Sequence, residues 1–214
     1  MSTHAPPDSL LPLPRDFYLP AADIVAPLLL GHSILRRTPQ GLCGGLIVET
    51  EAYVSDDPSC HAYVRETVRN RSMWGQEGRA YVYLIYGLHC CVNAVCRPRG
   101  TAEAVLIRAI EPAFGIDIMQ ANRRAAKARD LTNGPAKFCA ALDVTRAQDG
   151  VDLCDLHSPL WIARNPQADA LRESRGPVIT TTRIGITKAV DWPLRFYLDQ
   201  SEFVSRRAPK AKNT

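Results

Sequence analysis

Two carboxylates and a tyrosine alternate with apolar or small residues in GLIVETEAY, which begins at residue 45. Alternate residues of a strand share one face, so Glu49, Glu51 and Tyr53 would point to one side of a sheet, with the two acids roughly 7 Å apart. Such carboxylates repel each other unless solvent or a cation intervenes. The pattern therefore allows either a half-exposed strand with solvated acids, or a cleft in which one carboxylate is a general base beside a cationic neighbour.

Arg108 is the candidate for that cationic neighbour. It lies in AVLIRAIEP, where aliphatic residues on both sides would make an unpaired guanidinium costly. An acid or a phosphate should therefore face it. Two roles stay open for this arginine, a functional partner of the carboxylate or an ion pair that only ties strands together.

Aromatic residues gather in YVYLIYGLHCCVN, which begins at residue 81. Tyr86 precedes a glycine at the expected tip of a hairpin, where a ring is poorly placed for a core. It is either a cap or interface residue, or a wedge that enters a base stack as in DNA-deforming proteins. With a wedge, the flat rings of Tyr53, His61 and Tyr83 become candidates for a pocket that stacks on a purine.

Two further side chains suit nucleic acid. Asn93, on the strand that returns from the hairpin, can both donate and accept hydrogen bonds and so could read a base edge, although a satisfied strand asparagine is the ordinary alternative. Lys137 follows a helix start in GPAK, where free amide groups also favour an anion, so it is a candidate phosphate ligand. A solvated surface is the alternative for this and the other basic residues.

Composition and absent motifs exclude several classes. The net charge of +4 favours anionic partners without proving them. The neighbourhood of His61 and Cys60 matches no standard zinc spacing, so we expect no metal, and there is no G-x-S-x-G, P-loop or dinucleotide glycine fingerprint. Seven cysteines without a C-x-x-C pair indicate reduced thiols in the cytosol, and no apolar run approaches the roughly 18 to 20 residues of a membrane span.

The elements that must position these residues are mostly strands. Hairpins are predicted over 32–53 and 79–96, with further strands at 102–112, 178–186 and 193–198, and helical spacing at 21–31, 113–131 and 134–144. This order predicts an α+β fold, a single compact domain around a curved, mainly antiparallel sheet with flanking helices. We expect that domain over 17–205, a disordered tail over 1–16 and a basic tail over 206–214.

Eight motifs occur in order between about residues 20 and 205, namely GLIVETEAY, CHAY, RNRSM, AYVYLIYGLHCCVN, VLIRAIEP, LTNGPAKFCAALDV, RIGI and PLRFYL. Together they resemble the alkyladenine, or 3-methyladenine, DNA glycosylase family. The resemblance implies a compact mixed α/β domain with no metal or organic cofactor, which excises alkylated or deaminated purines from DNA.

The resemblance also implies a role for each matching position. Glu51, and not Glu49, matches the general base, and Arg108 matches an arginine close to that carboxylate and to the target nucleotide's backbone. Asn93 matches a residue that crowds the 2-amino group of guanine, and Lys137 falls in a family motif, here expected to contact the DNA backbone. Tyr53, His61 and Tyr83 match the rings that sandwich the flipped purine. Tyr86 matches the ring that intercalates into the duplex.

The expected function is a monofunctional DNA glycosylase. It would flip a damaged purine from double-stranded DNA and hydrolyse the glycosidic bond with water, as a monomer in the cytoplasm, associated with the nucleoid if the source is bacterial. Leu88 and His89, beside the wedge, depart from the family pattern and bear on the lesion range. A non-catalytic module that binds distorted DNA is the alternative, and a nucleosidase acting on free nucleosides is a third possibility.

Overall fold

The computed structural model describes residues 10–124 and 127–209. The strands of the described part are β1 (Ser33–Thr38), β2 (Gly41–Tyr53), β3 (Ala80–Ile85), β4 (His89–Cys96), β5 (Glu103–Phe114), β6 (Leu160–Ala163), β7 (Val178–Thr181) and β8 (Arg195–Leu198). The α-helices are α1 (Ala22–Leu29), α2 (Ile116–Asn122), α3 (Pro135–Ala141) and α4 (Ala168–Ser174). Short 3-10 helices are η2 (Arg15–Tyr18), η3 (Arg71–Trp74), η4 (Ala128–Leu131) and η5 (Arg146–Gln148).

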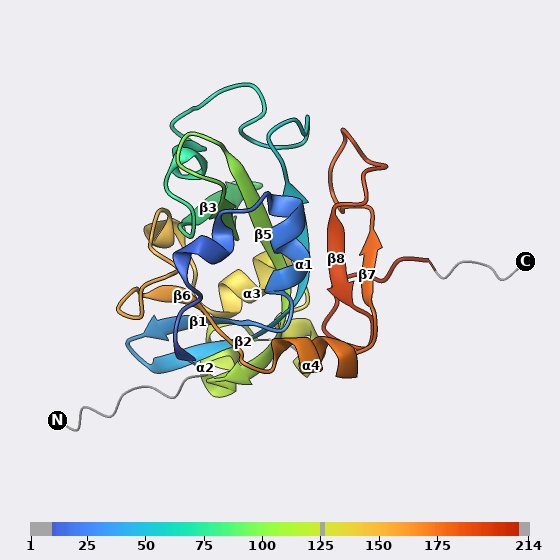
Figure 1. The fold of residues 1–214 in the computed structure, drawn as a ribbon. Coiled ribbons are helices and arrows are strands. Elements are labelled where there is room, and N and C mark those ends of the chain that lie inside the picture. The colour runs from blue at the N-terminus through green and yellow to red at the C-terminus, as the bar shows by residue number, and fades with distance from the viewer. Residues whose placement is uncertain (1–9, 125–126, 210–214) are drawn as a thin grey trace, which may run out of the picture.

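The strands form one curled sheet in the order β3-β4-β5-β2-β1-β6 (Figure 1). All pairs of named strands are antiparallel, and β2 is central, since it pairs with β5 along one edge and with β1 and then β8 along the other. The β7–β8 ribbon stands to one side of the other strands in Figure 1. These features confirm the predicted α+β fold around a curved, mainly antiparallel sheet.

The curl of the sheet has a local cause in β2. Its pairing with β5 shifts register on both sides of Glu49 and again between Gly44 and Gly45, and such bulges bend a strand and increase its twist. A Cβ atom at Gly45 would lie 2.1 Å from the carbonyl oxygen of Glu111. Glycine therefore permits the close approach of the two strands at this point.

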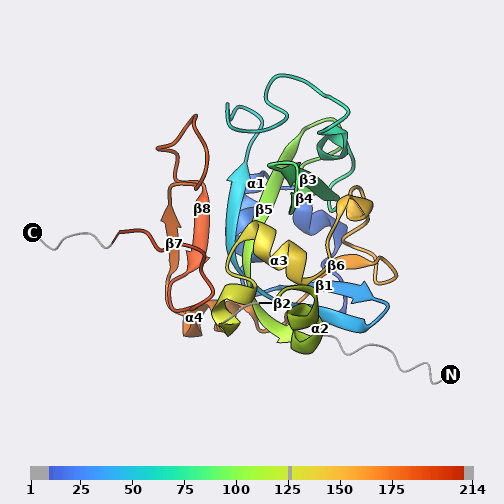
Figure 2. The ribbon, with the colours of Figure 1, turned by 180° about the vertical axis from the view of Figure 1, so that it is seen from behind.

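Two helices cover opposite faces of the long strands. Helix α1 lies in front of them in Figure 1, and α3 lies in front in the opposite view (Figure 2). On the α1 face the Thr50 hydroxyl donates to the carbonyl of Ala26 at 2.9 Å, and both residues are buried. Because side chains alternate along β2, its neighbours Glu49 and Glu51 are directed to the other face.

Several predicted elements differ from the observed ones. The helix predicted over 113–131 is only α2 followed by η4, because β5 continues to Phe114. The strand predicted over 178–186 ends at Thr181, which leaves the RIGI motif in an irregular segment. Strand β6 and helix α4 were not predicted, since the sequence between the predicted segments 134–144 and 178–186 is less regular than the rest.

The described parts of both predicted tails, residues 10–16 and 206–209, pack against the rest of the domain. Leu13 is buried, and the Trp161 indole donates to the carbonyl of Leu10 at 2.9 Å. At the other end the amide of Ala208 donates to the Tyr197 hydroxyl at 3.1 Å. The remaining residues of the predicted tails, 1–9 and 210–214, lie outside the described residues. Within the described part, no helix is both long enough and apolar enough to cross a bilayer.

Candidate active site

A cavity of about 470 Å³ opens between strands β2 to β5, the start of α3 and the segment 184–188. Six of the eight predicted site residues border it, and Glu51 and Lys137 do not. The six are Tyr53, His61, Tyr83, Tyr86, Asn93 and Arg108. Residues 55 positions apart in the chain are thus brought to one concave surface by the pairing of β2, β3, β4 and β5.

Glu51 lies directly behind the cavity wall. It is fully buried, yet each of its partners borders the cavity. The Tyr53 hydroxyl donates to Glu51 Oε2 at 3.0 Å, Arg108 Nη1 lies 3.1 Å from the same oxygen, and the amide of Ile184 donates to Oε1 at 2.8 Å. Of the roughly four acceptor positions of a carboxylate, this leaves one on Oε1.

Glu49 has a different set of partners. Its Oε1 accepts from Arg108 Nε at 3.1 Å, from Arg195 Nε at 2.7 Å and from the Ser205 hydroxyl at 2.8 Å, and its Oε2 accepts from the Ser205 amide at 2.7 Å. Glu49 is also fully buried and does not border the cavity. Four donors thus reach Glu49 and three reach Glu51, and of the two acids only Glu51 has all of its partners at the cavity.

Burial rules out one of the two interpretations of the strand. The half-exposed strand with solvated acids is wrong, because Glu49 and Glu51 are 0% exposed. Arg108 bridges them and is itself buried, as its aliphatic surroundings predicted. Burial alone would lower the pKa of Arg108, but the Glu51 and Glu49 carboxylates more than offset this and raise it, so the bridging guanidinium stays charged.

The aromatic side chains at the cavity form a cluster and one separate ring. The rings of His61 and Tyr83 meet edge to face at a centroid distance of 4.6 Å, and the Tyr81 ring stacks on Tyr83 at 5.4 Å. A base cannot enter between rings already in contact, so these residues make one wall of the cavity. Tyr53 supplies a separate ring, and burial, followed by the Glu51 charge, raises its pKa well above the ordinary value, so its hydroxyl stays protonated and donates.

His61 is held in place by Tyr81. The Nδ1 atom of His61 lies 3.0 Å from the Tyr81 hydroxyl, whose pKa is raised by burial so that it keeps its proton. Burial, and then the nearby Arg69, lower the pKa of His61. The imidazole is therefore uncharged at neutral pH.

Tyr86 stands at the tip of the β3–β4 hairpin. It is 88% exposed and borders the cavity, as does Ile85 beside it. Tyr86 and Gly87 have φ of 52° and 72°, and the Leu88 amide donates to the carbonyl of Ile85 at 3.3 Å. This is the backbone of a tight hairpin turn, which holds a bulky residue in the left-handed region and directs its ring away from the core.

Asn93 and Lys137 differ in their placement. Asn93 is buried at the cavity wall, and its Nδ2 donates to the carbonyl of Tyr81 at 3.0 Å. Lys137 does not border the cavity, although Pro135 does. Its Nζ donates to Asn133 Oδ1 at 2.7 Å and lies 3.8 Å from Asp130, so the structure ties this lysine to its own loop. Its contact with the DNA backbone stays a prediction.

Sequence reasoning assigned no role to several residues that contact the site. Asp57 and Arg183 form a buried ion pair, and Arg183 lies over the Tyr53 ring at 4.7 Å. The amide of Ile184 contacts Glu51. Arg183 and Ile184 belong to the RIGI motif, which was a signal, but only the folded chain shows what a backbone amide contacts.

Metal ligands and a reactive thiol are two further kinds of group that bear on the chemistry of this cavity. Within residues 10–124 and 127–209, no group of three or more histidine, cysteine or acidic side chains is arranged to hold a metal ion. Cys91 borders the cavity, but burial raises the pKa of its thiol to about 11. It is therefore a protonated thiol at neutral pH rather than a nucleophilic thiolate.

Comparison with known proteins shows the family of this chain. A family model described as methylpurine-DNA glycosylase matches residues 16–202. Three similar proteins, from Methanoculleus marisnigri, Francisella tularensis and Rhodopseudomonas palustris, are each named "Putative 3-methyladenine DNA glycosylase". They are 46%, 44% and 43% identical over 91%, 84% and 92% of this chain, and the matches cover 99%, 91% and 90% of those proteins. The chain therefore belongs to the methylpurine-DNA glycosylase family.

Proposed function

We propose that the protein is a monofunctional DNA glycosylase that removes alkylated or deaminated purines from duplex DNA by hydrolysis. The observation that carries this proposal is the placement of Glu51 behind an aromatic cavity, with one acceptor position free and an exposed tyrosine at the cavity rim. The proposal agrees with the family of the chain and with the names of its relatives.

The purine would stack between Tyr53 and the wall made by His61 and Tyr83. Flat rings accept either face of a base, and stacking contributes about 1–3 kcal/mol per base. Alkylation at a ring nitrogen gives the purine a positive charge, which adds a cation–π contribution of about 1 kcal/mol. Because the pKa of His61 is lowered, an uncharged imidazole faces this cation and does not repel it.

Asn93 would contribute to selectivity in the same pocket. It is buried at the wall, and its Nδ2 is fixed on the carbonyl of Tyr81. A rigid side chain at this position would crowd the 2-amino group of guanine, which adenine and hypoxanthine lack. Normal guanine would therefore be disfavoured by a steric clash.

In the chemical step a water molecule attacks C1′ of the extruded nucleotide. Its oxygen forms the new bond to C1′, its proton passes to Glu51, and the electrons of the broken C1′–N9 bond leave with the purine. The carboxylate also stabilises the positive charge that develops on the sugar. A cationic alkylated base departs as a neutral molecule, whereas hypoxanthine requires an additional proton from solvent.

DNA would approach the rim of the cavity. Tyr86 and Leu88 on the hairpin tip are 88% and 81% exposed, and Val64 and Val68, in the loop between His61 and Arg69, are 83% and 82% exposed. An apolar wedge can occupy the gap left by a flipped nucleotide, at an unstacking cost of a few kcal/mol. Arg69 borders the cavity beside this rim and supplies positive charge for phosphates.

The experiment is a single-turnover excision assay on duplexes that contain 3-methyladenine, 7-methylguanine, hypoxanthine or ethenoadenine. Glu51→Gln should slow excision by about 10²- to 10⁴-fold, since it removes the general base. Glu173→Gln, at an exposed position on α4, is the matched control and should not change the rate. Undiminished excision by Glu51→Gln would show that another group activates the water.

Two other outcomes identify the alternatives. If the wild-type protein binds lesion duplexes but excises none of the four bases, it is a binding module for distorted DNA. Equal activity on free nucleosides would indicate a nucleosidase. Because Lys188 also borders the cavity, borohydride should be added during turnover, and a trapped covalent adduct with DNA would show an amine nucleophile in place of water.

A further inference from the structure

Asp57 and Arg183 form an ion pair that the proposed chemical step does not use. Both side chains are fully buried. Arg183 Nη2 donates to Asp57 Oδ1 at 3.0 Å, while Nη1 donates to Asp57 Oδ2 and, at 3.0 Å, to the carbonyl of Ala52. Burial alone would lower the pKa of Arg183, but the hydrogen bond and charge of Asp57 more than offset this, so its pKa is raised and the guanidinium stays charged.

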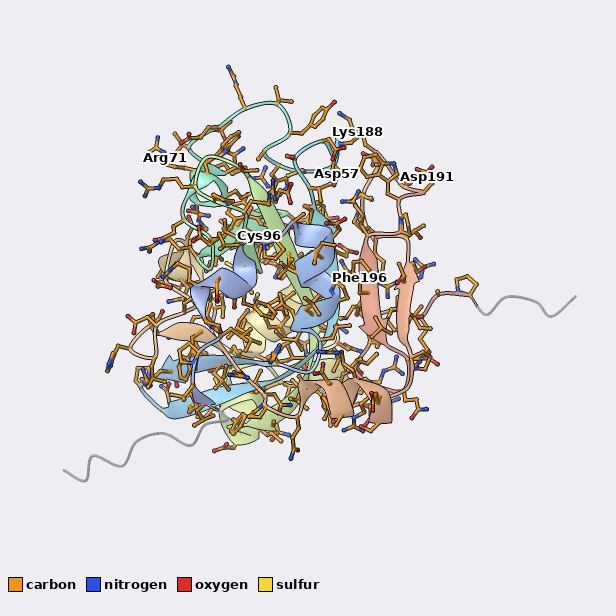
Figure 3. All side chains as sticks on the ribbon, in the orientation of Figure 1. Asp57, Arg71, Cys96, Lys188, Asp191 and Phe196 are labelled. Atoms are coloured by element: carbon orange, nitrogen blue, oxygen red, sulfur yellow. The ribbon has the colours of Figure 1, made fainter. Side chains whose placement is uncertain are left out.

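The two residues connect two segments of the chain that border the cavity. Asp57 organises the turn after β2, because its Oδ1 accepts from the Ser59 amide at 2.9 Å and its carbonyl accepts from the Cys60 amide at 2.9 Å. Arg183 precedes the segment 184–188, all of which borders the cavity. A second contact joins the same two segments, since the Ser59 hydroxyl donates to the carbonyl of Lys188 at 2.5 Å. Figure 3 shows Asp57 and Lys188 close to each other at one end of the molecule.

Arg183 is connected to two of the three groups that contact Glu51. It is bonded covalently to Ile184, whose amide donates to Glu51 Oε1 at 2.8 Å. Its guanidinium also lies 4.7 Å from the centre of the Tyr53 ring, and the Tyr53 hydroxyl donates to Glu51 Oε2 at 3.0 Å. The position of Arg183 therefore decides where both of these donors stand.

Buried ion pairs are expensive to form and often contribute little to stability, but a bidentate pair fixes geometry closely. We propose that Asp57 and Arg183 are positioning residues, which hold the Ile184 amide and the Tyr53 ring against Glu51 so that the free acceptor position of Oε1 faces the attacking water. This inference rests on the proposed glycosylase function. A displacement of about 1 Å at such a site can cost about 10²-fold in rate.

The test compares excision rate with DNA affinity in Asp57→Asn, which removes the charge but keeps the shape of the side chain. The single-turnover rate on a hypoxanthine duplex should fall by about 10- to 100-fold, while the Kd for the same duplex stays within about threefold of the wild-type value. A rate equal to that of the wild type, or a loss of rate matched by an equal loss of affinity, would overturn the proposal.

The matched control is Asp152→Asn. Asp152 pairs with Arg15 at 2.5 Å, and neither residue borders the cavity. This variant should lower the melting temperature without changing the excision rate. If Asp57→Asn does not fold, Arg183→Lys keeps the charge and removes the bidentate geometry, and the same divergence of rate and affinity is expected.

The positioning role and the glycosylase function fail in different ways. If the wild-type protein excises no base, the proposed function is wrong. If the wild type excises, Glu51→Gln does not, and Asp57→Asn excises at the wild-type rate, the function stands and the positioning role is wrong.

Discussion

Arg108 on β5 donates its Nε–H to Glu49 on β2 at 3.1 Å, and the same guanidinium lies 3.1 Å from Glu51. One arginine thus spans two fully buried carboxylates that point to the same face of the strand. The two carboxylates differ in their surroundings. Glu49 fixes the arginine, and the arginine also contacts Glu51, which lies directly behind the cavity wall.

Glu49→Gln should therefore lower the free energy of unfolding without greatly slowing excision. The change leaves Arg108 and Arg195 buried with one carboxylate fewer, and breaking a buried pair costs about 3–5 kcal/mol. Urea unfolding measures this loss. Below the melting temperature, excision should remain much faster than in Glu51→Gln. A stable Glu49→Gln protein that has lost all excision would instead make Glu49 the base.

Tyr86→Asn should separate DNA distortion from folding. The ring is 88% exposed, so its removal should change the free energy of unfolding by less than about 0.5 kcal/mol. Asparagine tolerates the left-handed backbone of Tyr86, so the turn is kept. Excision from a duplex should fall by about 10-fold or more, since unstacking costs a few kcal/mol.

The control for Tyr86→Asn is the same lesion in single-stranded DNA. No intact stack has to be opened there, so wild type and variant should excise the base at similar rates. An equal loss on both substrates would indicate that Tyr86 contributes to the base pocket instead of acting as a wedge.

His32 should make stability depend on pH. Its pKa is lowered to about 4, first by burial and then by Arg172 and Arg164, and its Nδ1 accepts from the Asn165 amide at 3.0 Å. As the pH falls below about 6.5, the unfolded chain binds a proton that folded His32 refuses. Stability should therefore fall between pH 6.5 and 4, by at most about 3 kcal/mol from this residue.

Urea unfolding at several pH values measures this effect. His32→Gln should be less stable at neutral pH but should show a smaller decline toward pH 4 than the wild type. The exposed His157 provides the control, because His157→Gln should leave the decline unchanged. A decline of wild-type size in His32→Gln would assign the pH dependence to other groups.

Local patterns in the sequence were sufficient for the strands that carry Glu51 and Arg108 and for the hairpin that carries Tyr86. Period-two alternation predicted β2, with its acids on one face, and the tyrosine–glycine turn predicted the β3–β4 hairpin with Tyr86 at its tip. The aliphatic surroundings of Arg108 predicted that an acid would face it. These features depend on residues close together in the chain, where strand geometry and turn chemistry act directly.

Only the tertiary structure decided which acid has all of its partners at the cavity and what holds it there. Glu49 meets Ser205 and Arg195 across about 150 residues, and Arg183 meets Asp57 across 126. Such contacts leave no periodic signal, because they depend on how β8 and the segment after β7 pack beside β2. The sequence by itself therefore determined the strands, the turn and the kinds of side chain available for chemistry. Burial and long-range packing assigned Glu49 to structure and left Glu51 facing the site.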